Sequence, residues 1–231
     1  MSETVARVFI GYDSKEVVAY HVLVQSILEH ASMPVAFVPI ALDSLKGTFT
    51  RERNALQSTE FSFSRFLTPY LSGYEGWSLF LDCDMLMRAD IAELWALRDE
   101  TKAVMCVQHD YQPKVETKFL GQVQTKYEKK NWSSAMLFNN AKCRALTPDF
   151  VNTASGLELH QFKWLSGDEE IGALPAGWNW LVNEYEHDPA AKNVHFTDGG
   201  PYFDEYRNDD YAEEWFAMRE RVLHVQQRAG A

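Results

Sequence analysis

Hydrophobic residues in this chain gather in short runs that end in turn residues. Runs of this length, without helical spacing and bounded by Gly, Pro, Asp or Asn, are typical of strands in the interior of a sheet. They predict strands at residues 5–11, 35–41, 77–81, 102–109 and 134–138, with a brief one from residue 193.

Helical spacing separates these runs. After a turn at residues 11–14, apolar side chains recur every three or four positions, which predicts a helix with one face on a sheet. That face consists of Val17, Tyr20, Val24, Ile27 and Leu28. Further helices are predicted at 61–71, from the capping box at Asp90, from Thr147 to Gly156, at 157–165 and at 211–227. Strands alternating with helices predict an α/β fold with a mixed, mainly parallel central sheet.

The chain has 231 residues, and 46% of them are hydrophobic, enough for one sizeable core. No internal repeat or low-complexity linker interrupts the order of elements, so we expect one domain over residues 1–231. It divides into a sheet-based half at 5–110, a more irregular half at 111–208 and a C-terminal helix at 209–231.

Charge and cysteine content narrow the possible partners. The formal net charge of -11 argues against nucleic acid and acidic membranes, because both require a basic face. Residues 1–7 carry no targeting signal, no apolar run approaches the ~20 residues that span a bilayer, and the C-terminal segment mixes Arg with Glu. We therefore expect a cytoplasmic protein without stable membrane attachment. Cys83, Cys106 and Cys143 have apolar neighbours and no metal-type spacing, which predicts reduced core thiols.

Two carboxylates, Asp82 and Asp84, follow the apolar run at residues 77–81. On a continuing strand, side chains two positions apart point to the same side, where this pair would hold one Mg²⁺ or Mn²⁺ ion bridged to a phosphorylated ligand. The alternative is a corner between strand and loop with two solvated carboxylates. The D-x-D string alone does not choose between them.

Six short motifs, one of which contains Asp82 and Asp84, follow one another along the chain. They are Val8-Phe9-Ile10-Gly11-Tyr12-Asp13, Phe63-Ser64-Arg65-Phe66-Leu67, Leu81-Asp82-Cys83-Asp84, Trp132-Ser133-Ser134-Ala135-Met136-Leu137-Phe138-Asn139, Gly167-Asp168-Glu169-Glu170-Ile171, and His195 with Gly199-Gly200-Pro201-Tyr202. Together they resemble the metal-dependent GT-A glycosyltransferases, most closely the retaining enzymes of family 8, which include lipopolysaccharide galactosyltransferases and glycogenin. The resemblance implies a Rossmann-like domain whose first half binds a nucleotide and whose second half binds an acceptor and completes a metal site.

The resemblance implies that Asp82, Asp84 and His195 bind one metal ion, with diphosphate oxygens at the remaining positions. A nitrogen ligand suits Mn²⁺ better than Mg²⁺. The ion would act as a Lewis acid on the leaving nucleoside diphosphate of a nucleotide-sugar, expected to be a UDP-sugar.

The same resemblance assigns Gly11, Tyr12 and Asp13 to the nucleobase. Tyr12 would stack on or flank uracil, and Asp13 would contact the base or cap the following helix. Arg65 would contact the donor or orient the neighbouring carboxylates. The alternative for Arg65 is an ordinary position on a helix surface.

At the diphosphate this chain departs from the family, because Gly stands where family 8 enzymes carry a Lys late in the chain. Cys83, Gly199 and Gly200 are predicted to lie beside the diphosphate. The missing charge would come from metal and backbone amides or from a basic loop, with Lys118 as the first choice. That loop carries Lys114, Lys118, Lys126, Lys129 and Lys130.

Asp168 and Glu169 match the family's Asp-Gln pair near the reacting centre. A carboxylate at Glu169 favours a nucleophilic route to retention, although a same-face route needs no nucleophile, and both residues also suit a helix N-terminus. Acceptor contacts are predicted for Trp132, Ser133, Trp178 and Asn179, with core packing as the alternative for either Trp.

These interpretations predict a retaining, metal-dependent glycosyltransferase whose partners are a nucleotide-sugar and a glycan or small-molecule acceptor. The alternatives are a GT-A-like nucleotidyltransferase, a nucleotide-sugar hydrolase, and a relative that binds nucleotide or glycan without catalysis. The two enzyme alternatives would use the same fold and metal, whereas the retained Asp pair, His195 and Glu169 count against a non-catalytic relative.

Overall fold

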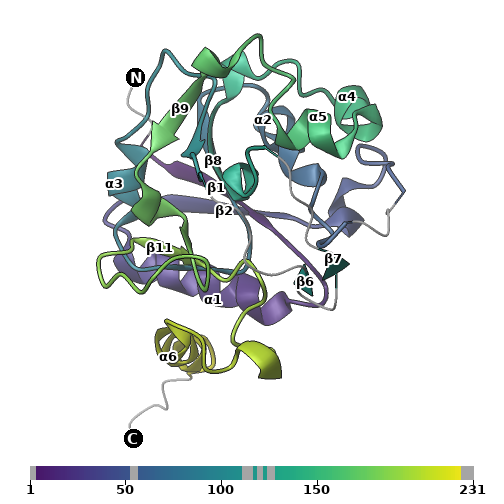
Figure 1. The fold of residues 1–231 in the computed structure, drawn as a ribbon. Helices are drawn as coiled ribbons and strands as arrows, with labels where there is room; N and C mark the ends of the chain where they lie inside the picture. The colour runs from purple at the N-terminus through teal and green to yellow at the C-terminus, as the bar shows by residue number, and fades with distance from the viewer. Residues whose placement is uncertain (1–3, 53–56, 111–116, 119–121, 124–127, 225–231) are drawn as a thin grey trace, which may run out of the picture.

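The structure is a computed structural model that describes residues 4–52, 57–110, 117–118, 122–123 and 128–224. A six-stranded sheet forms its centre, with helices packed around it (Figure 1). The strand order is β2 (Val35–Ile40), β1 (Ala6–Gly11), β3 (Trp77–Leu81), β8 (Ala135–Asn139), β5 (Val104–Val107) and β9 (Ile171–Leu174).

Within this sheet only β8 runs against its neighbours. The other pairs are parallel, which confirms the predicted mixed, mainly parallel sheet. β1, β3, β5 and β9 therefore run in the same direction, and their carboxyl ends lie at the edge where β8 begins. In open α/β sheets this edge is where ligands bind.

A second sheet has three strands, and its strand β4 (Met85–Met87) directly follows β3 of the first sheet in the sequence. The strand order of this second sheet is β10 (Trp180–Leu181), β11 (Asn193–His195) and β4, and β11 is antiparallel to β4. β3 ends at Leu81 and β4 begins at Met85, so residues 82–84 link one sheet to the other. The expectation of one strand continuing through Asp84 is wrong. A short two-stranded sheet, β6 (Thr117–Lys118) with β7 (Gln122–Val123), completes the described strands.

Helix α1 (Val17–His30) packs on the sheet with a face that overlaps the predicted one in part. Of the predicted residues, Ile27 is buried in the main core, Tyr20 and Val24 pack against it, and Val17 and Leu28 are exposed. The face is therefore shifted toward Ala19 and Leu23, which are buried in the same core. Helix α6 (Ala212–Val222) packs against α1 (Figure 1) and buries Trp215.

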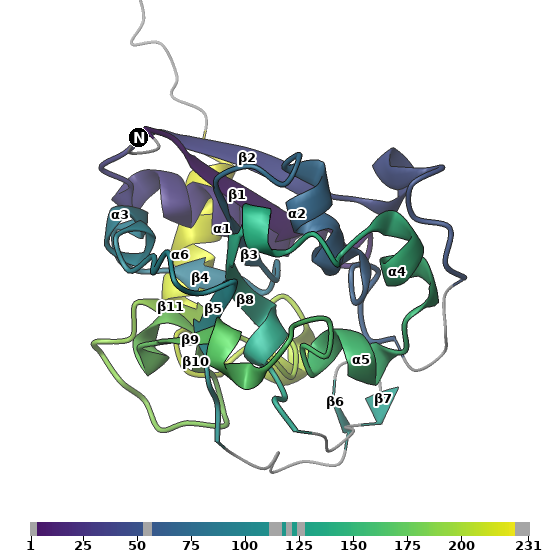
Figure 2. The ribbon, with the colours of Figure 1, turned by 90° about the horizontal axis from the view of Figure 1, so that it is seen from above.

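The remaining helices are short: α2 (Thr68–Leu71), α3 (Ile91–Trp95), α4 (Pro148–Thr153) and α5 (Gly156–His160). Seen from above, α4 and α5 lie on the side of the sheet away from α3 and α6 (Figure 2). Among the described residues, no helix combines the length and apolar character needed to cross a membrane.

Helix caps agree with the sequence at two positions and differ at two others. Thr147 accepts from the Phe150 amide and Asp90 from the Ala92 amide, as expected for N-caps. The expected capping box of α3 is not formed, because Glu93 pairs with Lys192 instead. The expected helix end at Gly156 is also wrong, since α4 stops at Thr153 and Gly156 opens α5.

The predicted helix at residues 61–71 is divided between a 3-10 turn, η2 (Ser64–Leu67), and α2. Phe61 precedes η2 and lies against β1, where Gly11 leaves room for its ring. A β-carbon added at Gly11 would lie 2.4 Å from two ring carbons of Phe61. Cys83, Cys106 and Cys143 are buried free thiols, as predicted.

Replacing Gly11 with Ala is expected to lower the free energy of unfolding by about 1–3 kcal/mol, because the new methyl group overpacks the Phe61 ring. Urea denaturation followed by circular dichroism measures this change. Gly177→Ala is the matched control, because the nearest atom to its β-carbon would lie at 3.7 Å, an ordinary contact. Equal stabilities of the two variants would contradict the close packing at Gly11.

Candidate functional site

The link between the two sheets aims its side chains in opposite directions. The Asp82 amide donates to Ser134 O (2.9 Å), which ties the link to the start of β8. Cys83 is buried in the main core, whereas Asp82 and Asp84 retain some exposure. Burial of the intervening thiol therefore turns both carboxylates toward the carboxyl edge of the large sheet.

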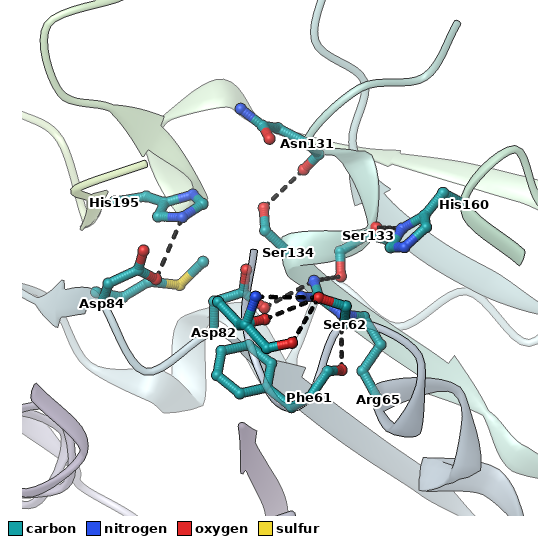
Figure 3. A network of polar contacts seen from close by, with 12 residues as sticks. Phe61, Ser62, Arg65, Asp82, Asp84, Asn131, Ser133, Ser134, His160 and His195 are labelled. Atoms are coloured by element: carbon teal, nitrogen blue, oxygen red, sulfur yellow. Dashed lines mark hydrogen bonds and ion pairs between the residues drawn. The ribbon is translucent and has the colours of Figure 1, made fainter. Parts of the chain in front are cut away.

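His195 reaches the same place through the small sheet. It pairs with Met85 across β11 and β4, and the Phe196 amide donates to Asp84 O (2.9 Å). This register brings His195 Nε2 to 3.3 Å from Asp84 Oδ1 (Figure 3). The ligand atoms of Asp82, Asp84 and His195 lie within 4.8 Å of one another.

Arg65 supplies the positive charge beside this cluster. Its Nη1 lies 2.7 Å from Asp82 Oδ1 and donates to Ser133 O at 2.9 Å (Figure 3). Its guanidinium also lies near the Phe61 and Phe80 rings, 5.2 and 5.1 Å from their centres. Arg65 is buried, so the alternative of a surface position is wrong, and the geometry suits orientation of a carboxylate.

Burial raises the pKa of two carboxyl groups at this site. Burial raises the pKa of Asp82 to about 6, with Asp84 adding to the shift and Arg65 opposing it. Burial also raises the pKa of Glu16, just before α1, to about 8, and repulsion by Asp84 adds to it. Burial therefore disfavours the charged forms of Asp82 and Glu16, and a cation bound beside them would favour those charged forms.

The donor atoms fit a divalent cation. Within the described residues, Oδ1 of Asp82 and Oδ1 of Asp84 are buried and make no hydrogen bond. The first has only its ion pair with Arg65, and the second faces a ring nitrogen of His195. Two carboxylates and one imidazole, with buried oxygen atoms left to coordinate, are a donor set for Mn²⁺ or a similar ion.

Of the three residues predicted to bind the nucleobase, two are packed against or bonded to other parts of the protein, and one is partly exposed. The space at Gly11 is occupied by Phe61. Both oxygens of the buried Asp13 accept backbone amides, those of Lys15 and Glu60, so its carboxylate neither caps α1 nor faces a base. Tyr12 remains partly exposed and packs edge-on against Tyr20.

Neighbouring side chains also pack against the residues predicted to lie beside the diphosphate. Gly199, with φ of 148°, passes so close to Tyr206 that a β-carbon would meet its ring. Gly200 leads to Tyr202, whose hydroxyl donates to Glu16. The thiol of Cys83 is buried, so only its backbone can serve a ligand.

The predicted basic loop lies largely outside the described residues, including Lys114 and Lys126. Lys118 belongs to β6, and its side chain is also outside the described part. Lys129 Nζ is 2.5 Å from Asp168 Oδ1 and donates to Gln161 O. Lys129 is therefore engaged with the segment before β9, and a replacement for the family Lys stays a prediction.

Asp168 and Glu169 are not members of the Asp-Asp-His cluster. They form η6 (Asp168–Glu170) just before β9, and both side chains are exposed. Asp168 pairs with Lys129, which precedes η4 and β8. Their predicted place near the reacting centre stays a prediction, and a role as polar residues at the start of a short turn stays its alternative.

Three of the four residues predicted to bind an acceptor are buried. Trp178 packs in the core, Ser133 Oγ hydrogen bonds with His160 Nδ1 (2.7 Å), and Asn179 is fully buried. Their side chains present no surface to an acceptor. Trp132 is partly buried, and its Nε1 donates to His109 O.

Three residues that the sequence pattern did not single out are linked to the cluster or to its partners: Glu16, His109 and His160. Each acts through a partner distant in the sequence, and none has a local spacing signal. A buried Glu beside a D-x-D pair is recognisable only when tertiary contacts are known.

Comparison with solved structures agrees with this architecture. The chain is similar to the bifunctional glycosyltransferase WbbM (TM-score 0.65, 13% identity, 96% of this chain and 51% of WbbM). It is also similar to the glycosyltransferase GlyE of Streptococcus pneumoniae TIGR4 (TM-score 0.63, 13% identity, 96% of this chain and 62% of GlyE). A third similar structure is the galactosyltransferase LgtC (TM-score 0.60, 12% identity, 96% of this chain and 98% of LgtC). The chain thus spans about half of WbbM and less than two thirds of GlyE. At these identities the likeness defines the fold, which is the GT-A fold of glycosyltransferases.

No family model matches the chain. It is 51% identical over 218 residues to protein CDI of Arabidopsis thaliana, which covers 90% of this chain and 84% of that protein. The chain belongs to the family of protein CDI.

Arg65→Met is expected to destabilise the metal-free protein by about 3–5 kcal/mol, because it leaves the Asp82 carboxylate buried without a counter-charge. Adding Asp82→Asn should recover much of this loss, and urea denaturation of the two single variants and the double variant measures it. Lys46→Met, at an exposed pair with Asp43, is the control and should cost less than about 1 kcal/mol. Additive effects of the two substitutions would contradict the pairing.

Glu16→Gln is expected to change how stability depends on pH in metal-free protein. Because folding raises the pKa of Glu16 from 4.5 to about 8, the unfolded chain releases this proton first as pH rises. Wild-type stability should therefore fall relative to the variant between pH 4.5 and 8, by up to about 1.4 kcal/mol per pH unit. Denaturation at pH 5, 6, 7 and 8 in EDTA tests this, and parallel curves would refute it.

Proposed function

We propose that this protein is a metal-dependent glycosyltransferase that moves a sugar from a nucleotide-sugar to an acceptor. The observation that carries the proposal is the cluster of Asp82, Asp84 and His195 at the carboxyl edge of a GT-A sheet. The solved form of LgtC, which has the same fold, contains donor and acceptor sugar analogs. That likeness supports the same two classes of ligand for this chain.

In this proposal Asp82, Asp84 and His195 hold one divalent cation, with Mn²⁺ favoured by the nitrogen ligand. When bound, the cation supplies positive charge that stabilises a leaving diphosphate. Arg65 holds the Asp82 carboxylate in place through a buried ion pair, and the bend at Cys83 keeps the two Asp side chains on one side. The protein's own contribution is thus a preorganised, partly dry set of ligands.

We propose UDP as the nucleotide, on the strength of the sequence motifs, with Tyr12 as the remaining side chain able to flank the base. We also propose that the sugar keeps its anomeric configuration. A carboxylate at Glu169 would allow a nucleophilic route, and a same-face route, in which the enzyme shields an ion-pair-like transition state, needs no nucleophile.

Asp84→Asn and His195→Gln should each abolish the Mn²⁺-dependent part of UDP binding, because each removes one metal ligand. Isothermal titration of UDP with and without Mn²⁺ measures this loss. Asp90→Asn is a matched control, because Asp90 is an N-cap on α3 and lies outside the cluster. Unchanged Mn²⁺-dependent binding in both ligand variants would overturn the proposed site.

A panel of UDP-sugars with Mn²⁺ then separates transfer from the alternatives. Transfer requires an acceptor for turnover beyond slow donor hydrolysis. Fast donor cleavage without acceptor would identify a hydrolase, and release of pyrophosphate from a nucleoside triphosphate would identify a nucleotidyltransferase.

A further inference from the structure

A chain of buried hydrogen bonds leads away from the metal-ligand cluster through Asn179. His195 Nδ1 lies 3.0 Å from Asn179 Oδ1. On its other side, Asn179 Nδ2 faces three acceptors: Ser134 Oγ at 2.8 Å, His109 Nε2 at 3.0 Å and Asn131 O at 3.2 Å. Asn179 is fully buried and His195 nearly so, which gives these contacts a low-dielectric setting.

The orientation of the Asn179 amide follows from its neighbours. Asn131 O is a backbone carbonyl and can only accept, so the amino group of Asn179 must face it. Ser134 donates its own proton to the same carbonyl (2.6 Å), which leaves its oxygen free to accept from Asn179. A flipped amide would set Oδ1 of Asn179 against these oxygens. Oδ1 therefore faces His195.

This orientation determines the proton on His195. Because Asn179 Oδ1 can only accept, Nδ1 of His195 must carry a hydrogen and donate it. In the neutral ring the lone pair is then on Nε2, which faces Asp84 Oδ1 at 3.3 Å. Two lone pairs at this separation, with Asp82 beside them, repel each other unless a metal ion or a proton lies between them.

We propose that Asn179 is a positioning residue that keeps His195 in the Nδ1-protonated form, so that Nε2 is free to bind the divalent cation. The proposal deepens the function proposed above and rests on it. Asn179 acts through His195 and does not touch the metal or the substrate. Partners of this kind fix the ring orientation and raise the basicity of a metal-binding imidazole.

His109 in turn holds Asn179. His109 Nε2 accepts from Asn179, so its other nitrogen carries the proton, and that nitrogen lies 2.7 Å from the hydroxyl of Tyr185. Burial lowers the pKa of His109 to about 3, which keeps the ring neutral and able to accept. Hydrogen bonds are therefore donated outward from the cluster: His195 donates to Asn179, and Asn179 donates to His109 and to Asn131 O.

The first test needs no substitution. Long-range ¹H–¹⁵N NMR correlations of the imidazole rings report which nitrogen of each His is protonated, with His195→Gln used to assign the His195 signals. With saturating Mg²⁺, a diamagnetic probe, the proposal requires a proton on Nδ1 and none on Nε2 of His195. A proton on Nε2 with a bare Nδ1 would overturn it.

The second test compares two substitutions of the same residue. Asn179→Leu removes the acceptor for His195 and should weaken Mn²⁺ binding about 10- to 100-fold, measured by titration calorimetry on folded protein. Asn179→Asp keeps an oxygen opposite Nδ1 and should bind Mn²⁺ more nearly like wild type. Asn140→Leu is the matched control: Asn140 is equally buried but bonds to Glu75 O and Ser78 Oγ, away from the cluster. Its Mn²⁺ affinity should not change.

The outcomes separate this inference from the proposed function. If wild type binds Mn²⁺ and loses it in Asp84→Asn but not in Asn179→Leu, the role of Asn179 is refuted and the metal site stands. Equal losses in the Leu and Asp variants would show a purely structural role and also refute it. If wild type binds no Mn²⁺, both proposals fail. Should Asn179→Leu not fold, the Asp variant and the NMR measurement decide.

Discussion

The pairing of β4 with β11 is the constraint on which the candidate site depends. β4 begins one residue after Asp84, and β11 ends at His195, so their register sets a carboxylate and an imidazole side by side although more than a hundred positions separate them in the chain. β3, one link earlier, belongs to the large sheet and ends just before Asp82. The site is therefore the junction of two sheets, and its geometry is as rigid as their backbone hydrogen bonds.

Buried charge is the second constraint. Burial raises the pKa of Asp82 and of Glu16, which lie near Asp84, and among the described residues Arg65 forms an ion pair with Asp82. A protein that only needed stability would replace such a group with apolar residues. Keeping it, with two buried oxygen atoms that make no hydrogen bond, fits a site that is complete only with a further cation.

The polar groups behind the cluster form an ordered arrangement. Backbone carbonyls and neutral side chains orient Asn179, and Asn179 orients His195. On the other side, Arg65 joins Asp82 to Ser133 O, and Ser133 Oγ meets His160. The ligands are therefore held by segments from both halves of the chain.

The sequence by itself determined the fold class, the main strands, the D-x-D link and, through ordered motifs, the pairing of Asp82 and Asp84 with His195. The first three depend on local periodicity and on chemically specific residue types, and the last on the resemblance to the GT-A glycosyltransferases. Only the tertiary structure decided that Asn179 and Ser133 are buried, that Phe61 fills the space at Gly11, and that Asp168 and Glu169 lie at the amino end of β9. Burial and strand register arise from contacts between distant segments. Spacing along the chain carries no record of them.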